Sequence, residues 1–154
     1  GSISGSSGMV RSLELGRLKG KNMVQVGLRG YATTQQWGVG VKYGVNRILA
    51  PEFEKIGAEV AAKRSLQWAR RGTDKIYLTV DVDALNPGEA PGTGWPEPGG
   101  LTVQQLLDFV RYLAPHVDAF DIAELNPIFD GAPKQTVVMC ARLLLDFVTA
   151  KARA

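Results

Sequence analysis

The chain has 154 residues, which is long enough for one domain with a hydrophobic core and too short for two. Its net charge of +3 comes without a long run of like charges, which argues against nucleic-acid binding. No apolar stretch is long enough to cross a bilayer and no basic leader precedes one, so we expect a cytoplasmic protein without a membrane partner.

Apolar periodicity predicts strands and helices in alternation along the chain. A short strand is expected over Met23–Leu28. A helix is expected over Glu52–Arg71, because Pro51 suits its first turn and apolar residues recur at helical spacing. These apolar residues are Phe53, Ile56, Val60, Leu66 and Trp68. The next strand is expected over Ile76–Val82.

The second part of the chain continues this alternation. Thr102 can cap a helix that ends at Pro115 and whose apolar face is Val103, Leu106, Leu107, Val110 and Leu113. A strand is expected over Val117–Ile122 and a closing helix over Lys134–Lys151. The residues of the closing helix that we expect to face inward are Val137, Val138, Ala141, Leu144, Leu145 and Val148. Strands separated by helices of this length pair in parallel through crossovers, so the predicted fold is a three-layer α/β architecture.

Two acids stand where the second of these strands ends. The apolar run before them delivers Asp81 and Asp83 to one place, and burying two ionised carboxylates there would cost several kcal/mol each without a nearby cation. A hard divalent metal fits best. Because strand side chains repeat every two residues, we expect both acids to face the same side. The alternative is that one caps the turn after the strand while the other is solvated.

The acids and the Gly- and Pro-rich loop after them carry a family resemblance. The chain resembles the ureohydrolases, which are the arginases, agmatinases, guanidinobutyrases and formimidoylglutamases. The motifs that carry the resemblance are Asp81-Val82-Asp83, Ala90-Pro91-Gly92-Thr93-Gly94, Gly99-Gly100-Leu101 and Asp121-Ile122-Ala123-Glu124-Leu125-Asn126-Pro127, with a weaker match over Asn22–Gly30. The resemblance implies the C-terminal half of an arginase-like parallel-sheet fold, and we expect residues 1–154 to form a partial ureohydrolase domain.

The resemblance also implies roles for particular residues. Asp81 would bridge two manganese ions and Asp83 would bind one of them. Glu124 would accept hydrogen bonds from the guanidinium group of the substrate, and Asp121 would support the catalytic site from behind. Trp95 would line the substrate pocket, at a position where many members have threonine, so the resemblance does not identify the particular substrate. The alternative is that Trp95 only packs within its loop.

The two histidine-bearing metal motifs of the family, Gly-Gly-Asp-His and Asp-x-His-x-Asp, are absent from the sequence. The only histidine, His116, is expected to be an ordinary solvent-facing residue. We therefore expect manganese binding by the chain alone to be weak or absent, and the isolated chain to be inactive. The segment Gly1–Gly8 reads either as a linker or as the Ser-Gly-rich loop of the family, with Ser7 where many members carry a proton-shuttling histidine.

Several functional alternatives stay open at this point. The first is part of a manganese-dependent hydrolase for a guanidino or amidino compound, closest to the agmatinase and guanidinobutyrase group. The second is a non-catalytic fragment that acts as an interaction module. A magnesium-dependent phosphoryl or glycosyl transferase is disfavoured, because the sequence has no glycine-rich phosphate loop. Since half of the sheet is missing, we expect a homo-oligomer or a partner chain that supplies the missing half.

Overall fold

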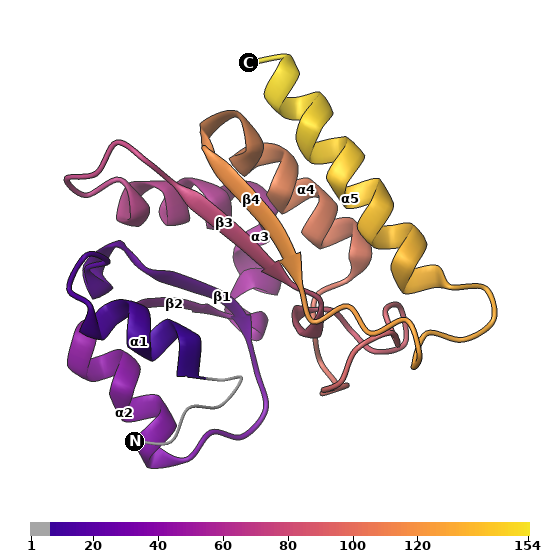
Figure 1. Ribbon diagram of the computed structural model, residues 1–154, viewed down its shortest axis with the longest axis horizontal. Helices are drawn as coiled ribbons and strands as arrows, with labels where there is room; N and C mark the ends of the chain where they lie inside the picture. The colour runs from indigo at the N-terminus through magenta and orange to yellow at the C-terminus, as the bar shows by residue number, and fades with distance from the viewer. Residues whose placement is uncertain (1–6) are drawn as a thin grey trace.

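A computed structural model gives the structure of the chain and describes residues 7–154 (Figure 1). Helices and strands alternate through most of its length. In chain order the elements are α1 (Gly8–Glu14), η2 (Gly20–Asn22), β1 (Val24–Leu28), α2 (Thr34–Tyr43), β2 (Asn46–Leu49), α3 (Ala50–Ala69), β3 (Tyr77–Asp81), η3 (Val82–Ala84), α4 (Val103–Leu113), η4 (Ala114–His116), β4 (Ala119–Ala123) and α5 (Gln135–Ala152). Most of the segment Gly1–Gly8 lies outside the described residues.

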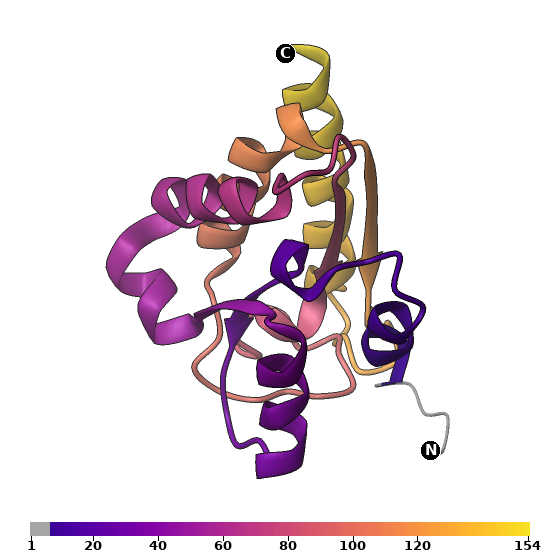
Figure 2. The ribbon, with the colours of Figure 1, turned by 90° about the vertical axis from the view of Figure 1, so that its left-hand side faces the viewer.

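The four strands form two parallel pairs. β1 pairs with β2, and β3 pairs with β4 in a register that sets Thr79 opposite Asp121 and Asp81 opposite Ala123. Within the described residues the two pairs are not joined into one sheet, and they lie apart in both ribbon views (Figures 1 and 2). The expected parallel pairing is confirmed, and the carboxyl ends of β3 and β4 meet at one edge.

The end of β1 lies beside the turn that follows β3. Gly27, near that end, has a left-handed φ of +84°. A Cβ atom on Gly27 would lie 2.8 Å from Leu101 Cδ1 and 3.6 Å from Ala84 Cβ, so a side chain would not fit without a shift of Leu101. The chain after β1 therefore runs close beside η3, which follows β3.

Aromatic side chains connect the helices to each other and to the strands. Phe53 of α3 is fully buried and meets Phe109 of α4 edge to face, with 5.4 Å between the ring centroids. Phe120 of β4 stacks on Phe147 of α5 at 4.2 Å. These contacts bury one face of each helix, and this burial supplies most of the stability of such helices.

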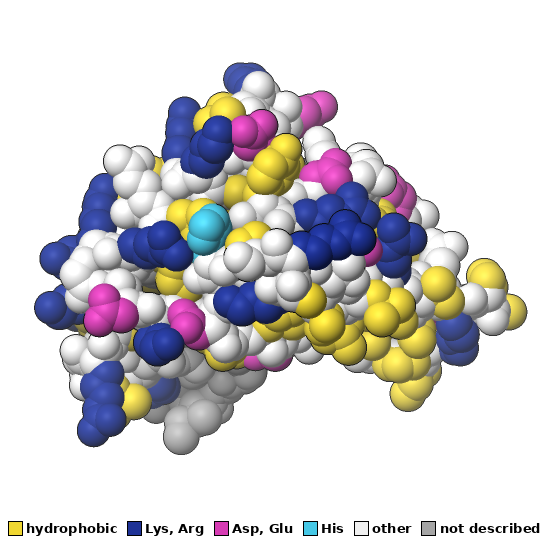
Figure 3. Space-filling view, turned by 90° about the horizontal axis from the view of Figure 1, so that it is seen from above, with side chains coloured by type: hydrophobic (Ala, Val, Ile, Leu, Met, Phe, Trp, Pro, Cys, Tyr) yellow, Lys and Arg dark blue, Asp and Glu magenta, His cyan; other side chains and the backbone are white. Residues whose placement is uncertain are grey.

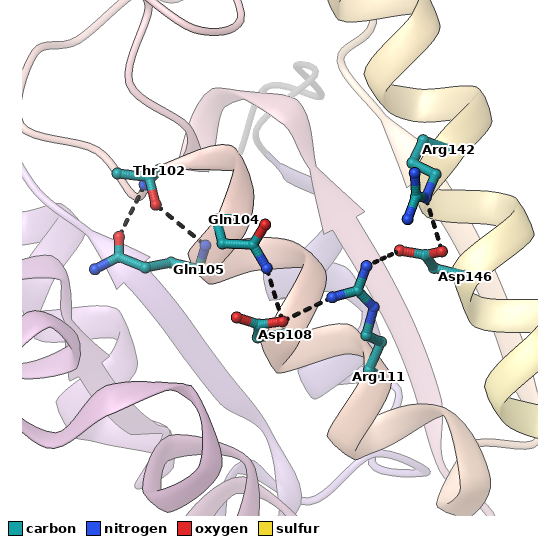
Figure 4. A network of polar contacts seen from close by, with 7 residues as sticks. All are labelled: Thr102, Gln104, Gln105, Asp108, Arg111, Arg142 and Asp146. Atoms are coloured by element: carbon teal, nitrogen blue, oxygen red, sulfur yellow. Dashed lines mark hydrogen bonds and ion pairs between the residues drawn. The ribbon is translucent and has the colours of Figure 1, made fainter.

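Polar contacts fix α4 against α5 (Figure 4). Thr102 and Gln105 form a reciprocal capping box at the start of α4, which confirms the predicted cap. Further along α4, Arg111 forms ion pairs with Asp108 at 2.7 Å and with Asp146 of α5 at 2.5 Å. Asp146 also pairs with Arg142. These side chains are partly exposed, so they orient the two helices more than they stabilise the fold.

Besides the short 3-10 turns, three elements were not expected from the sequence: α1, α2 and β2. β2 has only four residues, so it is too short to show a clear alternation of apolar and polar residues, and it pairs with β1. Helix α2 contains Gly38 and Gly40, which lower helix propensity, but a capping box of Thr33 and Gln36 starts it. α3 follows the predicted range but bends at Gly57, where φ is 76°.

The inward face predicted for the closing helix is wrong. The residues of α5 that the structure buries are Thr136, Met139, Cys140 and Leu143. Five of the six residues expected to face inward are instead exposed: Val138 (63%), Ala141, Leu144 (49%), Leu145 (64%) and Val148 (55%). Val60 of α3, which was also expected inside, is 42% exposed. Seen from above, hydrophobic side chains are exposed on the side of the molecule that carries α5 and the loop before it (Figure 3).

α5 carries two apolar stripes, and this explains the error in the predicted inward face. At 100° per residue, its apolar residues occupy two arcs of the helix, and sequence periodicity alone does not distinguish them. The core uses the arc of Met139, Cys140 and Leu143. Cys140 is buried, and loss of hydration followed by the Asp130 charge raises the pKa of its thiol to about 11.

In the described part of the chain, no helix is long and apolar enough to span a membrane.

Candidate functional site

The two predicted acids lie together at the carboxyl end of β3. The strand ends at Asp81, and the 3-10 turn η3 follows with Asp83 inside it. Asp81 Oδ1 accepts a hydrogen bond of 2.8 Å from the backbone N–H of Asp83, so Asp81 caps this turn. The acids are therefore neighbours because of the turn and not because of strand alternation. Asp81 is exposed to solvent, whereas Asp83 is half-buried.

Parallel pairing brings Glu124 to the same edge. Ala123 is the last residue of β4 and lies opposite Asp81, so Glu124 follows directly beside the turn that holds Asp83. Glu124 has a left-handed φ of 62°, an uncommon conformation for a residue with a side chain. Such conformations cost free energy and concentrate at functional sites. The structure therefore brings together three of the acids selected from the sequence.

The crowding of acids changes their protonation. Loss of hydration, followed by the charges of Asp81 and Glu124, raises the pKa of Asp83 to about 6. Partial loss of hydration raises the pKa of Asp81 as well; the Asp83 backbone N–H opposes this shift, and the Glu124 charge adds to it. Arg29 lowers both pKa values, but by less than these effects raise them. The negative charge gathered at this sheet edge therefore favours the binding of a cation.

A cavity of about 450 Å³ opens beside the acids. Asp81 and Asp83 form one wall, and the chain from Val26 to Tyr31 forms another. Trp95 also lines the cavity and is 71% exposed, so the structure places it at the mouth of the predicted pocket. Its role in substrate binding stays a prediction.

Arg29 holds the outer wall of this cavity in place. Its Nε donates to the carbonyl oxygens of Glu97 at 3.0 Å and Pro98 at 3.1 Å. Its Nη2 donates to the carbonyl oxygens of Leu85 at 3.0 Å and Glu97 at 2.5 Å. The guanidinium thus joins the end of β1 to the loop after the acids. The role of Arg29 in joining these segments cannot be recognised in the sequence, because its partners are backbone carbonyl oxygens and any residue type provides one.

Thr93 is a second site residue that was not predicted from the sequence. It is only 4% exposed, and its hydroxyl donates a short hydrogen bond to Asp83 Oδ1. Its Oγ1 also accepts the backbone N–H of Trp95 at 3.3 Å. Thr93 belongs to the motif Ala90–Gly94, which was the only available signal of its importance.

Asp121 lies further back along β4 than Glu124. Its Oδ1 accepts a 2.7 Å hydrogen bond from Thr79, and its Oδ2 accepts a short one from Tyr77. Both partners belong to the adjacent strand β3, as the register requires. Asp121 does not line the cavity. None of these hydrogen bonds reaches Asp81, Asp83 or Glu124, so the supporting role expected for Asp121 stays a prediction.

The donors present do not complete a metal centre. Carboxylate oxygens suit hard divalent cations, and Asp81 and Asp83 offer them side by side. Across residues 7–154, however, no three His, Cys, Asp or Glu side chains converge closely enough to hold a metal ion. The only histidine, His116, lies in η4 and is exposed, as expected. This chain alone therefore does not fit the binuclear manganese centre that the resemblance implies.

Comparison with known proteins agrees with the motifs. A family model described as the Arginase family matches residues 2–149. The human mitochondrial guanidino acid hydrolase is 34% identical over 147 residues, which cover 91% of this chain and 40% of that protein. An agmatinase of Chromobacterium violaceum is 30% identical over 139 residues, which cover 90% of this chain and 40% of that protein.

Solved structures show the same relationship. Formimidoylglutamase from Bacillus subtilis superposes with a TM-score of 0.87 at 28% identity, covering 92% of this chain and 45% of that one. A hypothetical agmatinase from Burkholderia thailandensis gives a TM-score of 0.82 at 29% identity, covering 99% of this chain and 46% of that one. The predicted arginase-like fold is confirmed, and the chain spans less than half the length of these relatives.

Proposed function

Because the chain belongs to the arginase family, we propose that it forms one part of a hydrolase that cleaves a guanidino or amidino compound. The observation that carries the proposal is the meeting of Asp81, Asp83 and Glu124 at one sheet edge, where Asp81 and Asp83, but not Glu124, line a cavity. The names of the relatives support the substrate class, since they include agmatinase, guanidinopropionase and formimidoylglutamase.

The residues of this chain suit a planar cation. Glu124 presents a carboxylate that can accept two parallel hydrogen bonds from a guanidinium or amidinium group. Glu124 follows β4 with a left-handed backbone at the sheet edge, and the negative field of Asp81 and Asp83 attracts the positive charge of the substrate. Water adds to the central carbon and the C–N bond to the amine breaks. A guanidino substrate then yields urea and a protonated amine, as in the agmatinase and guanidinobutyrase group.

Ligands from outside these residues are part of the proposal. Asp81 and Asp83 are too few to hold manganese, so we propose that further ligands come from a segment outside residues 1–154, on the same or another polypeptide, that carries the histidine-bearing motifs. Such ligands could complete a metal site only in the assembled protein. The alternative, a non-catalytic fragment that serves as an interaction module, is favoured by the same incomplete donor set.

Reconstitution tests the proposal. The full chain is mixed with the part of the Chromobacterium violaceum agmatinase that this chain does not match, in buffer containing manganese, and urea release from agmatine and 4-guanidinobutyrate is measured. We expect release only from the mixture. Glu124→Gln should lower it by about tenfold or more, because a charged hydrogen-bond acceptor is lost. Glu54→Gln, an exposed glutamate of α3, is the matched control and should leave it unchanged.

The outcomes separate the two functions. Full activity of the Glu124→Gln mixture would remove Glu124 from substrate binding. Formation of a stable complex without urea release from either compound would favour the interaction module over the hydrolase.

A further inference from the structure

Asp130, in the loop before α5, is a buried carboxylate that binds the first turn of this helix. Asp130 is 1% exposed, and its Oδ1 accepts hydrogen bonds from the backbone N–H of Thr136 at 3.1 Å and from the Thr136 hydroxyl at 2.9 Å. Its Oδ2 accepts the backbone N–H of Val137 at 3.0 Å. Asp130 thus satisfies two free amides of the first turn of α5, because Lys134, the N-cap residue, makes no side-chain cap bond.

The Thr136 hydroxyl does more than this capping requires. It is fully buried, and besides donating to Asp130 it accepts the backbone N–H of Gly92 at 2.9 Å. The carbonyl oxygen of Gly92 in turn accepts the backbone N–H of Asn126 at 2.8 Å. A Cβ atom on Gly92 would lie 2.8 Å from Asp130 Cβ and 2.9 Å from Thr136 Cβ. Only glycine therefore allows this close approach without a shift of the helix start.

Gly92 and Thr93 contact Asp83 and the two residues that follow Glu124. Thr93 donates its hydroxyl to Asp83, and its backbone forms an antiparallel bridge with Leu125. Leu125 and Asn126 directly follow Glu124 in the chain. One short buried segment, Gly92–Thr93, therefore lies between the turn that carries Asp83 and the chain that carries Glu124.

We propose that Asp130 and Thr136 are positioning residues, which set the placement of Asp83 relative to Glu124 through Gly92 and Thr93. They contact neither the cavity nor the acids, so they act through the segment they hold. Their importance for catalysis rests on the proposed function. The mechanical link itself does not, and it can be measured in the full chain without substrate, metal or a second polypeptide.

The test is nuclear magnetic resonance of the metal-free full chain. Thr136→Val keeps the shape of the side chain and removes the hydroxyl, whereas Thr136→Ser restores the hydroxyl. In Thr136→Val we expect the amide of Gly92 to exchange about tenfold faster, which corresponds to the loss of one hydrogen bond. The side-chain carboxyl carbon signals of both Asp83 and Glu124 should shift. In Thr136→Ser the exchange rate and both signals should return toward those of the parent chain.

Controls separate positioning from general stability. Ser65→Ala removes another buried hydroxyl, one that donates to Ala61 within α3, and it should move neither carboxyl signal. If Thr136→Val does not fold, Thr93→Val and Thr93→Ser test the last link of the connection with the same two carboxyl signals. Unchanged signals of Asp83 and Glu124 in a folded Thr136→Val or Thr93→Val chain would overturn the proposal and leave Thr136 as a helix cap only.

Discussion

Replacement of Asp83 by asparagine should stabilise the metal-free chain at neutral pH. Asp83 is half-buried beside Asp81 and Glu124, and its pKa is raised to about 6. Its ionised form is therefore less favourable in the folded chain than in the unfolded chain. Asparagine keeps the shape of the side chain and an oxygen that can accept the Thr93 hydroxyl. The substitution removes the unfavourable charge and retains this contact.

The size of the effect follows from the pKa. The value rises from 3.8 to about 6, and one pKa unit is worth about 1.4 kcal/mol, so the ionised group costs at most about 3 kcal/mol. Because the pKa is raised in the folded state, the free energy of unfolding falls as the pH rises from about 4 to about 6 and then stays level. We expect Asp83→Asn to gain about 1–3 kcal/mol at pH 7.5 and almost nothing near pH 3.5.

Urea unfolding in the presence of a chelator measures this gain at both pH values. Asp74→Asn, which removes an exposed acid, is the control and should change the free energy of unfolding by less than about 0.5 kcal/mol. The reasoning is refuted if Asp83→Asn gives no gain at pH 7.5, or if the gain is as large at pH 3.5.

Two further predictions concern Arg29 and the exposed stripe of α5. Arg29→Lys should lower the free energy of unfolding by about 1–3 kcal/mol, because a lysine cannot reach three carbonyl oxygens at once; urea unfolding measures it, and an equal loss in the exposed control Arg17→Lys would contradict it. Leu145→Glu should weaken self-association of the chain in analytical ultracentrifugation, because it puts a charge in an apolar stripe that is open to solvent. Gln67→Glu, which makes the same change of charge at an exposed position of α3, is the control and should not weaken it. A parent chain that is monomeric at every concentration would contradict the prediction for Leu145.

Local patterns in the sequence were sufficient for several elements. The cap at Thr102 and most of the apolar face of α4 were identified correctly, because both depend on residues within a few positions of each other; buried Phe109 was not included in that face. The strands around Val24, Tyr77 and Ala119 were located to within two residues. The position of Asp81 at a strand end and the family motifs around it could also be recognised in the sequence, and the comparisons confirm the family.

Other features depend on contacts between distant segments. The short strand β2 exists because it pairs with β1, and its four residues carry too little pattern to reveal it. Arg29 and Thr93 became site residues only when the fold placed backbone carbonyls and Asp83 within reach of them. The partners of Asp121 were likewise set by the register of β3 and β4.

The sequence by itself determined β1 and the longer helices and strands from α3 onward, their parallel pairing and the acids that gather at the sheet edge. Only the tertiary structure decided which face of α5 is buried and how Glu124 comes to lie beside Asp83. A helix with apolar residues on two faces fits a core in two orientations, and the packing of Met139 and Leu143 selects one of them. The meeting of Asp83 and Glu124 depends on the register of two strands that are separated by a helix, which no local periodicity encodes.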